Sequence, residues 1–354
     1  MPSLREEYKS QNKNKIIILS VMMIILIILF YVSLFTGTGN LTFKDELYGL
    51  FNKSTNINNA IMRKIRLPHV ISSLICGVAL GASGLIMQTT LGNKMASPGT
   101  LGVSNAAVLG ANIAIIIFSG GIVSTQNGTV FNSTYSTTII AFIFSLIAIG
   151  LILVLSKFKN FSRETVILVG IALGALFQAL TNIIQYFSVD VKLAAAVYWT
   201  FGDLSRTTMN QNYFLIGIVA ISIVVFALFT NSYNGLEIGD ESARSLGINT
   251  ESVRMISLFV ASLLTASVIS FYGIIGFLGI MGPHIARRFV GSNHKYLLPA
   301  SILTSTIILE VSDLIARVAF KGVALPVGAV TAIIGAPFFL YLVFSKREVK
   351  DYYA

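Results

Sequence analysis

Long apolar runs alternate with short polar segments along nearly the whole chain of 354 residues. A run of about 20 apolar residues can cross the hydrocarbon core of a bilayer as a helix. Inside lipid only helices and closed barrels satisfy their own backbone hydrogen bonds, and these runs mostly do not alternate in polarity, so the pattern predicts helices. Ten spans are expected, at residues 16–36, 66–90, 98–119, 137–157, 164–187, 212–230, 253–272, 274–290, 296–318 and 326–345.

Two of the apolar runs differ from a plain span. Run 16–36 follows a charged N-terminus, as in a signal peptide, but it is about 20 residues long and lacks a small-residue cleavage motif, so a first transmembrane helix is predicted. Run 274–290 is short, interrupted by glycines, and leads into Pro283 and His284. Because proline bends the chain and glycine permits close backbone approach, we expect a tight, packed turn there at the membrane surface.

Composition supports a membrane protein. Hydrophobic residues make up 55% of the chain and charged residues 11%, whereas soluble domains carry roughly 25% charged residues. The net charge of +10 comes from basic residues in short loops, which positive-inside bias explains better than nucleic-acid binding. We therefore predict a single membrane domain, 16–345, between a cytoplasmic N-terminal segment, 1–15, and a cytoplasmic tail, 346–354.

One basic cluster does not fit positive-inside bias. If the N-terminus is cytoplasmic, the loop before the second span is external, yet it carries Arg63, Lys64 and Arg66. Such an exception to positive-inside bias calls for a reason. Either the topology differs at this point or these charges act outside the cell.

The polar segment 231–254 is far longer than two helices need to turn. Asp240 can N-cap a short helix that Gly247 would end, and Asn249 or Thr250 can cap the next one. Two short helices on the cytoplasmic face would form a rigid docking surface, with a solvated loop as the alternative. The sequence contains no G-x-x-x-x-G-K-[ST] motif, so an energy-supplying partner is expected.

Candidate chemistry is sparse. The single cysteine, Cys76, lies in an apolar run and is expected to be a buried thiol, with no disulfide and no cysteine metal site. The three histidines, at 69, 284 and 294, lie at membrane edges and form no recognisable catalytic or zinc arrangement. An ion-coupled transporter would need buried titratable groups, for which Glu310 and Asp313 are the candidates. This transporter, an intramembrane enzyme and a passive channel stay as less favoured alternatives, and neither a catalytic nor a metal site is predicted.

Seven motifs in order resemble permeases of the FecCD type, the membrane subunits of ABC importers for ferric siderophores, haem and cobalamin. They are RLPHVISSLICGVALGASGLIMQ (66–88), GNKMASPGTLGVSNAAVLGA (92–111), ILVGIALGAL (167–176), YWTFGDLS (198–205), GIIGFLGIMGPHIARRFVG (273–291), LLPASILTSTIILEVSDLIAR (297–317) and LPVGAVTAIIGAPFFLYLV (325–343). The resemblance implies an all-helical permease with about ten spans and a second permease subunit, a copy or a paralogue, beside it. It also implies a cytosolic ATPase dimer that binds ATP and Mg²⁺, so this chain needs no cofactor, and an extracellular binding protein.

The resemblance assigns roles to particular residues. Segment 236–252 falls where the family has coupling helices, so residues Asp240, Glu241, Ser242, Ala243, Arg244, Ser245, Leu246 and Gly247 are expected to contact the ATPase. Arg66 and Arg317 occupy positions that receive acidic residues of the binding protein, although Asp313 could instead pair with Arg317 across one helical turn. Asn93 and Met95 occupy the inner-gate positions. The chain departs from the family at Lys94, where proline is usual, and at His69, where arginine is usual.

Polar residues of the fifth predicted span lie mostly on one helical face, and they could line a wet path. These residues are Gln178, Thr181, Asn182 and Gln185. Hydrogen bonding between packed helices explains them equally well. We expect an import permease in a bacterial plasma membrane, with a ferric siderophore as the first cargo candidate, then haem, then cobalamin.

Overall fold

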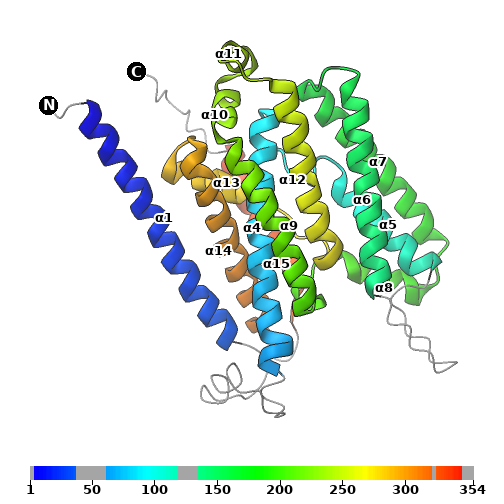
Figure 1. Cartoon of the computed structure of the whole chain (residues 1–354). Coiled ribbons are helices and arrows are strands. Elements are labelled where there is room, and N and C mark those ends of the chain that lie inside the picture. The colour runs from blue at the N-terminus through cyan, green and yellow to red at the C-terminus, as the bar shows by residue number, and fades with distance from the viewer. Residues whose placement is uncertain (1–3, 37–60, 119–133, 321–323, 345–354) are drawn as a thin grey trace.

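The computed structural model describes residues 4–36, 61–118, 134–320 and 324–344, and all regular structure in these ranges is helical (Figure 1). This confirms the predicted fold class. In chain order the elements are α1 (Leu4–Phe35), a π-helical turn η1 (Met62–Arg66) continuous with α4 (Leu67–Leu91), α5 (Val103–Asn112) continuous with η2 (Ile113–Ile117), α6 (Thr134–Lys157), α7 (Arg163–Tyr186), α8 (Asp190–Thr200), η3 (Leu204–Arg206), α9 (Met209–Leu228), α10 (Thr230–Ile238), α11 (Asp240–Ser245), α12 (Thr250–Tyr272), α13 (Leu278–Val290), α14 (His294–Val318) and α15 (Val327–Phe344).

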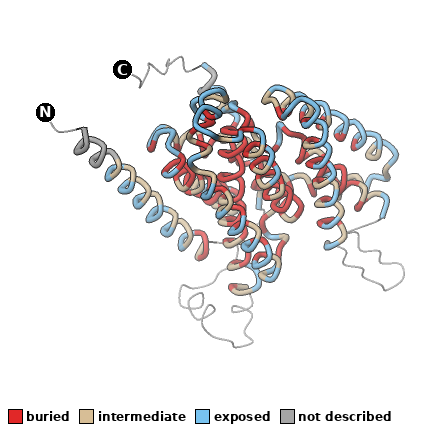
Figure 2. Tube along the Cα trace, turned by 45° about the horizontal axis from the view of Figure 1, so that its top comes forward, coloured by how far each residue is buried: buried red, intermediate tan, exposed pale blue. Residues whose placement is uncertain are grey.

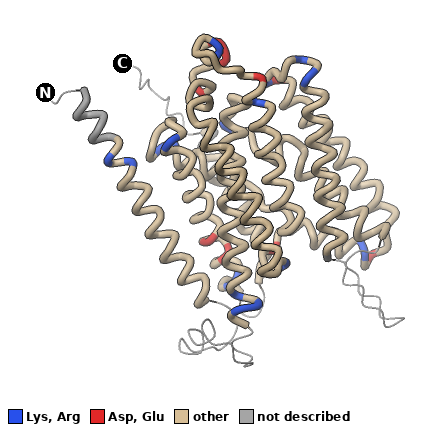
Figure 3. The backbone as a smooth tube through the Cα atoms, in the orientation of Figure 1, with Lys and Arg blue, Asp and Glu red and all other residues tan. Residues whose placement is uncertain are grey.

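Consecutive long helices run in opposite directions, so the bundle has two ends (Figure 1). We call the end that carries α10 and α11 the upper face, and the opposite end, where η1 and α8 lie, the lower face. Most Lys and Arg residues lie near one of these ends (Figure 3). The two faces match the two sides expected from the loop charges, and which of them is cytoplasmic stays a prediction.

Helix α4 forms the centre of the bundle. Its side chains are almost all buried, and α9, α12, α13 and α14 pack around it. Buried residues accordingly gather in the middle of the molecule, while α1 on one side is largely exposed (Figure 2). Small residues allow this packing: a Cβ on Gly84 would overlap the backbone of Gly279 in α13. Close approach of backbones through small residues is how membrane helices gain packing energy.

Seven helices of the described residues are long and apolar enough to cross a membrane. Two shorter apolar stretches, Val103–Ile117 and Val327–Tyr341, and the half-length α13 fill the remaining predicted positions. The predicted span 98–119 begins later than expected, because Gly102 has a φ of 73° and lies against the backbone of α7. Its left-handed conformation ends the preceding turns and lets the helix start at Val103.

The predicted turn at Pro283 is wrong. The chain is irregular from Gly273 to Phe277 and then helical without a break through Pro283 and His284. Proline cannot donate to the carbonyl four residues earlier, which is that of Gly279. Gln88 Nε2 of α4 donates to this carbonyl at 3.0 Å. A side chain from the neighbouring helix therefore replaces the missing backbone bond, which is how membrane helices tolerate proline.

Two short helices were not predicted. Helix α8 follows α7 at the lower face, and α10 continues from the end of α9 at the upper face (Figure 1). The second short helix expected near Asn249 is instead the first turn of α12, for which Asn249 is the N-cap, accepting from the Ser252 N–H at 3.0 Å.

Candidate functional sites at the two ends of the bundle

Helices α10 and α11 stand out from the upper face as a helical platform, which we define as residues 230–247 (Figure 1). Ala243 is buried beneath it. The outward side combines polar and apolar groups, and Ile238 and Leu246 are 65% and 67% exposed. Of the eight residues predicted to contact the ATPase, six are exposed, namely Glu241, Ser242, Arg244, Ser245, Leu246 and Gly247.

Asp240 anchors the platform from below. Its predicted role as N-cap is wrong, because Gly239 occupies that position and the Asp240 carboxylate turns toward two arginines. Arg254 Nη2 donates to both carboxylate oxygens, at 2.9 and 2.8 Å, and Arg163 Nη2 donates to one at 2.6 Å. Burial alone would raise the pKa of Asp240, but the hydrogen bonds and charges of Arg254 and Arg163 outweigh it and lower this pKa.

Arg254 extends this anchor into the bundle. Only 2% of its surface is exposed. Its Nε donates to the Thr90 carbonyl at the end of α4, at 2.8 Å, and its Nη1 donates to the Phe161 carbonyl between α6 and α7, at 2.7 Å. Asp240 is thereby connected to α4, to the loop between α6 and α7 and to α12 through one buried guanidinium. We call Asp240, Arg254 and Arg163 the upper network.

A second set of contacts holds α10. Asn234 Oδ1 accepts from the backbone N–H of His294 at 2.8 Å and lies 3.0 Å from its Nδ1. The Nε2 of the same ring lies 2.7 Å from Thr89 Oγ1, so His294 joins α10 to α4. Arg287, in the last turn of α13, forms an ion pair with Glu237. The basic end of the Pro283 helix therefore touches the platform.

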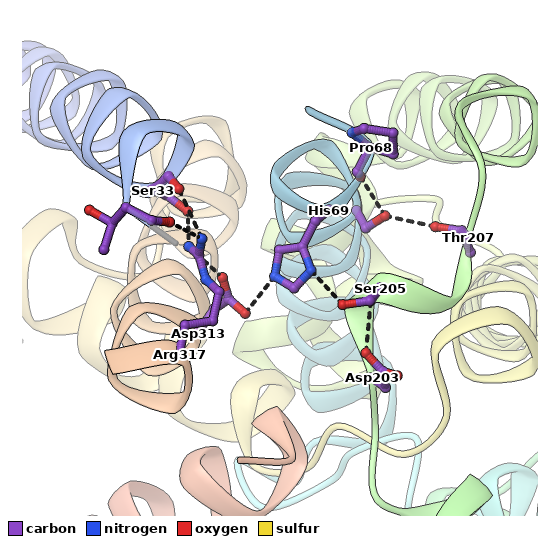
Figure 4. Close-up of polar contacts among 10 residues, drawn as sticks. Ser33, Pro68, His69, Asp203, Ser205, Thr207, Asp313 and Arg317 are labelled. Atoms are coloured by element: carbon purple, nitrogen blue, oxygen red, sulfur yellow. Dashed lines mark hydrogen bonds and ion pairs between the residues drawn. The ribbon is translucent and has the colours of Figure 1, made fainter. Parts of the chain in front are cut away.

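A second network lies at the lower face (Figure 4). Asp313 of α14 is its centre: Oδ1 lies 2.8 Å from His69 Nε2 and Oδ2 lies 2.9 Å from Arg317 Nη2. His69 Nδ1 in turn lies 2.9 Å from Ser205 Oγ. We call these four residues the lower network. The pairing of Asp313 with Arg317, left as an alternative by the sequence, is present.

Arg317 also caps the end of α1. Its Nη1 donates to the carbonyls of Ser33 and Thr36, at 2.9 and 2.6 Å, and its Nη2 donates to Ser33 Oγ. A cation at the C-terminal carbonyls of a helix is favourable because it opposes the helix dipole. The side chain is 12% exposed. Arg66, the other predicted docking arginine, is 6% exposed, and its Nη1 lies 3.9 Å from Met62 Sδ.

A cavity of about 220 Å³ opens beside the lower network. The chain between α8 and α9 forms one wall, where Asp203 Oδ1 accepts from the Ser205 N–H at 2.8 Å and Arg206 lies 3.8 Å from Asp203. The end of α14 and residues 324–327 form the other wall. Both charged pairs, Asp203 with Arg206 and Asp313 with Arg317, line it.

The remaining predicted site residues separate into different surroundings. Asn93 and Met95 lie in the loop after α4, where Asn93 Oδ1 accepts from the Met95 N–H at 2.9 Å and the Met95 side chain is exposed. They contact neither network through any hydrogen bond among the described residues. Their gate role stays a prediction.

The polar stripe of α7 is divided. Gln178 and Asn182 are exposed and hydrogen-bonded to each other at 2.9 Å. Thr181 is buried and donates to the Phe177 carbonyl, while Gln185 donates to Asn112 of α5 at 3.0 Å. Thr181 and Gln185 therefore contribute to helix packing, and of the four residues only Gln178 and Asn182 are exposed.

Sequence reasoning missed the partners of Asp240 and His69. Arg163 and Arg254 belong to the basic loop residues that positive-inside bias already explains, and no pattern in the sequence distinguishes Ser205. The pairs are separated by 77, 14 and 136 positions, beyond any local spacing rule. The only usable signal was the presence of charged residues at helix ends in a chain that has few of them.

Taken together, an all-helical bundle of membrane-crossing length with a helical platform at one end is typical of a polytopic membrane protein. The chain belongs to the FecCD transport family, whose model matches residues 25–345. This confirms the resemblance found in the motifs. The family consists of transport permeases, so the chain is a permease subunit of an ABC importer.

Individual comparisons agree with this membership. A protein of Methanocaldococcus jannaschii that is named as an ABC transporter permease is 41% identical over 343 residues, covering 97% of this chain and 98% of its own length. The hemin transport system permease HmuU of Yersinia pestis is 31% identical over 337 residues, covering 95% and 97%. A solved metal-chelate type ABC transporter in an inward-facing conformation superposes with a TM-score of 0.78, at 26% identity, covering 94% of this chain and 99% of its own.

Proposed function

We propose that this chain is the permease subunit of an ATP-driven importer that takes ferric siderophores from an extracellular binding protein. The observation that carries the proposal is the anchored platform. Its outer side exposes Ile238 and Leu246, while Asp240 beneath it is fixed to a buried arginine. Exposed apolar side chains on a rigid, capped surface are what a protein partner needs for docking.

The platform suits a partner that moves. Because Arg254 connects Asp240 to the ends of α4 and α12, a shift of α11 would displace the inner ends of several spans together. Two cytosolic ATPase subunits that close on ATP would supply that shift, and ATP and Mg²⁺ would bind to them. The upper face is then cytoplasmic, with both chain termini on the same side.

The pathway would form between this permease and a second one, identical or paralogous. The open face of α7 supports this arrangement, because Gln178 and Asn182 are polar, exposed and hydrogen-bonded to each other. Uncharged amides can contact a bulky chelate without holding it tightly. The loop residues Asn93 and Met95 would narrow the inner exit, where Lys94 adds a cation that proline would not.

The lower face would receive the binding protein. Arg66 and Arg317 place positive charge there, and charges at a wet interface set the orientation and association rate more than the affinity. Because the Arg317 guanidinium already binds Asp313 and the end of α1, its contribution is its field more than a free N–H group. A ferric siderophore is the first cargo candidate. Haem and cobalamin are also metal chelates, and the similarity to a hemin permease makes haem the second candidate.

Co-purification tests the proposal. We expect a tagged chain from its native membrane to carry an ABC ATPase, and Leu246→Asp to lose at least about nine-tenths of it, because a charge replaces an anchoring apolar side chain. Phe158→Asp, at an exposed apolar residue outside the platform, should keep the ATPase. Absence of an ATPase from the wild-type preparation, or equal recovery with both variants, would contradict the docking role.

Uptake assays distinguish the cargo. Cells expressing the chain should import an iron-labelled hydroxamate or catecholate siderophore in an ATP-dependent manner, in competition with the unlabelled ferric complex. Import of haem or cobalamin instead would replace the first cargo candidate. Import that follows a proton or sodium gradient without ATP would favour the ion-coupled alternative, for which Glu310, fully buried in α14, is the residue to examine.

A further inference from the structure

Helix α1 is attached to the bundle mainly through α14, and most of its surface is exposed. At its lower end Arg317 of α14 binds the carbonyls of Ser33 and Thr36. In its middle Met22 Sδ lies 4.0 Å from Thr304 Oγ1 of α14. The contact at its upper end has a different character, because it gathers charged side chains of both helices.

Two ammonium groups meet at one aromatic ring near the upper face. Lys15 lies two turns above Met22 on the same side of α1, and its Nζ is 5.4 Å from the centroid of the Tyr296 ring in α14. The Nζ of Lys295 is 5.9 Å from the same centroid. Figure 3 shows basic positions on α1 and on the neighbouring end of the bundle at similar height. Each distance is within the roughly 6 Å reach of a cation–π contact, but two like charges at one ring repel each other.

The protein supplies no counter-ion to these two lysines among the side chains that the structure describes. Neither Lys15 nor Lys295 forms an ion pair there, and Glu237, at the end of α10, is already paired with Arg287 of α13. Lys295 is exposed and Lys15 is half-buried, so both ammonium groups are accessible to a ligand. The site therefore attracts an anion from outside the chain.

The surroundings indicate which anion fits. Ile16 and Ile17, next to Lys15, are exposed apolar side chains of a helix that is long enough to cross a membrane, so lipid chains would cover them. Tyrosine is typical of the membrane–water interface, where lipid headgroups lie, and basic pockets between transmembrane helices bind anionic headgroups. A phosphate group with acyl chains matches both the charge and the apolar surface, whereas a free phosphate would match only the charge.

We propose that Lys15, Lys295 and Tyr296 bind the phosphate group of an anionic phospholipid, such as phosphatidylglycerol, that bridges α1 and α14. Lysine carries its charge on a flexible four-carbon chain, so both ammonium groups can donate to the phosphate oxygens. The bound phosphate offsets the repulsion between the lysines and secures the upper end of α1, as Arg317 secures the lower end. The inference goes beyond the proposed function and does not rest on it, because a lipid site requires neither an ATPase nor a particular cargo.

Native mass spectrometry of the tagged importer, purified in an uncharged detergent and depleted of lipid, tests the site. Phosphatidylglycerol is titrated, and the dissociation constant of the first bound lipid is measured. Phosphatidylcholine with the same acyl chains, which has no net charge, and inorganic phosphate are titrated in parallel. A lysine beside an anionic headgroup contributes about fivefold in affinity. The double variant Lys15→Gln, Lys295→Gln should therefore bind phosphatidylglycerol about 25-fold more weakly.

Two further double variants separate a specific site from general attraction. Lys157→Gln, Lys159→Gln removes two exposed lysines at the upper end of α6, on the other side of the bundle (Figure 1), and should keep wild-type affinity. Lys15→Arg, Lys295→Arg keeps both charges and should stay within about fivefold of wild type. Equal losses for the two glutamine variants would overturn the proposal. Phosphatidylcholine or inorganic phosphate that binds as tightly as phosphatidylglycerol would also overturn it.

Failure of a variant to assemble does not prevent a decision. Each single variant, Lys15→Gln or Lys295→Gln, should lose about fivefold in affinity, and exposed substitutions of this kind usually change stability little. ATPase recovery in the same preparations tests the proposed function separately. An importer that recovers its ATPase but binds phosphatidylglycerol equally in all variants would contradict this inference alone, whereas loss of the ATPase with a lysine-dependent lipid site would contradict only the proposed function.

Discussion

The upper and lower networks have the same plan but different chemistry. Each centres on one aspartate that binds two basic side chains from other parts of the chain. Asp240 binds Arg254 and Arg163, while Asp313 binds Arg317 and His69. The upper network contains only guanidinium partners, which stay charged at any physiological pH. The lower network contains an imidazole instead, whose two ring nitrogens contact Asp313 and Ser205.

This difference matches the work proposed for each face. A coupling platform must transmit motion under all conditions, so permanent ion pairs suit it. A docking face must bind and release a partner repeatedly, which suits side chains that lie beside an open cavity. The burial of the basic partners also differs: in the upper network Arg254 is 2% and Arg163 24% exposed, whereas His69 and Arg317 are each 12% exposed. Because Arg254 is the most buried of the four, its substitution should cost the most stability.

The largest effect is expected for Arg254→Leu. The substitution removes the main partner of Asp240 and leaves the carbonyls of Thr90 and Phe161 without their donor. Breaking a buried ion pair from one side costs about 3–5 kcal/mol. We expect a loss of about 3 kcal/mol in the free energy of unfolding, since Asp240 is partly exposed. Unfolding in mild detergent, followed by Trp199 fluorescence, measures it.

Arg244→Leu is the matched control. Arg244 lies on the exposed side of α11, 10 positions before Arg254, and makes one side-chain bond, at 3.2 Å to Thr250 Oγ1. Exposed substitutions of this kind usually change stability by less than about 0.5 kcal/mol. Equal losses for Arg244→Leu and Arg254→Leu would show that the upper network does not hold the platform.

A smaller loss is expected for Arg317→Leu. The variant removes the cap from α1, but Asp313 keeps its hydrogen bond to His69. Charge-assisted hydrogen bonds contribute about 1.5–3 kcal/mol, so we expect about 2 kcal/mol in the same unfolding assay. Lys64→Leu, at an exposed cation on the same face, should be close to neutral. A loss larger than that of Arg254→Leu would reverse the ranking of the two networks.

The sequence predicted more of the fold than of the sites, for physical reasons. Apolar length and helix caps are local, and they located the long helices and the Asn249 cap. Whether a proline interrupts a membrane helix depends on a neighbour: Gln88 satisfies the Gly279 carbonyl, and the helix continues through Pro283. Ion pairing depends on residues that are distant in the sequence. Asp240 fits an N-cap by sequence, but its carboxylate binds Arg163 of α7 and Arg254 of α12 instead.

The smallest effect is expected from acid acting on Asp240 of the upper network. The pKa of Asp240 is lowered in the folded protein, so its stabilising contribution is complete above the ordinary carboxyl pKa, near about 4. It is lost as pH falls through the folded value. The stability difference between wild type and Asp240→Asn should therefore be constant from about pH 7 to about pH 5 and shrink below about pH 4. Unfolding temperatures of both proteins across this range measure it. A difference for Asp240→Asn that shrinks between about pH 7 and about pH 5, or that persists unchanged below about pH 3, would contradict the pairing of Asp240 with the two arginines.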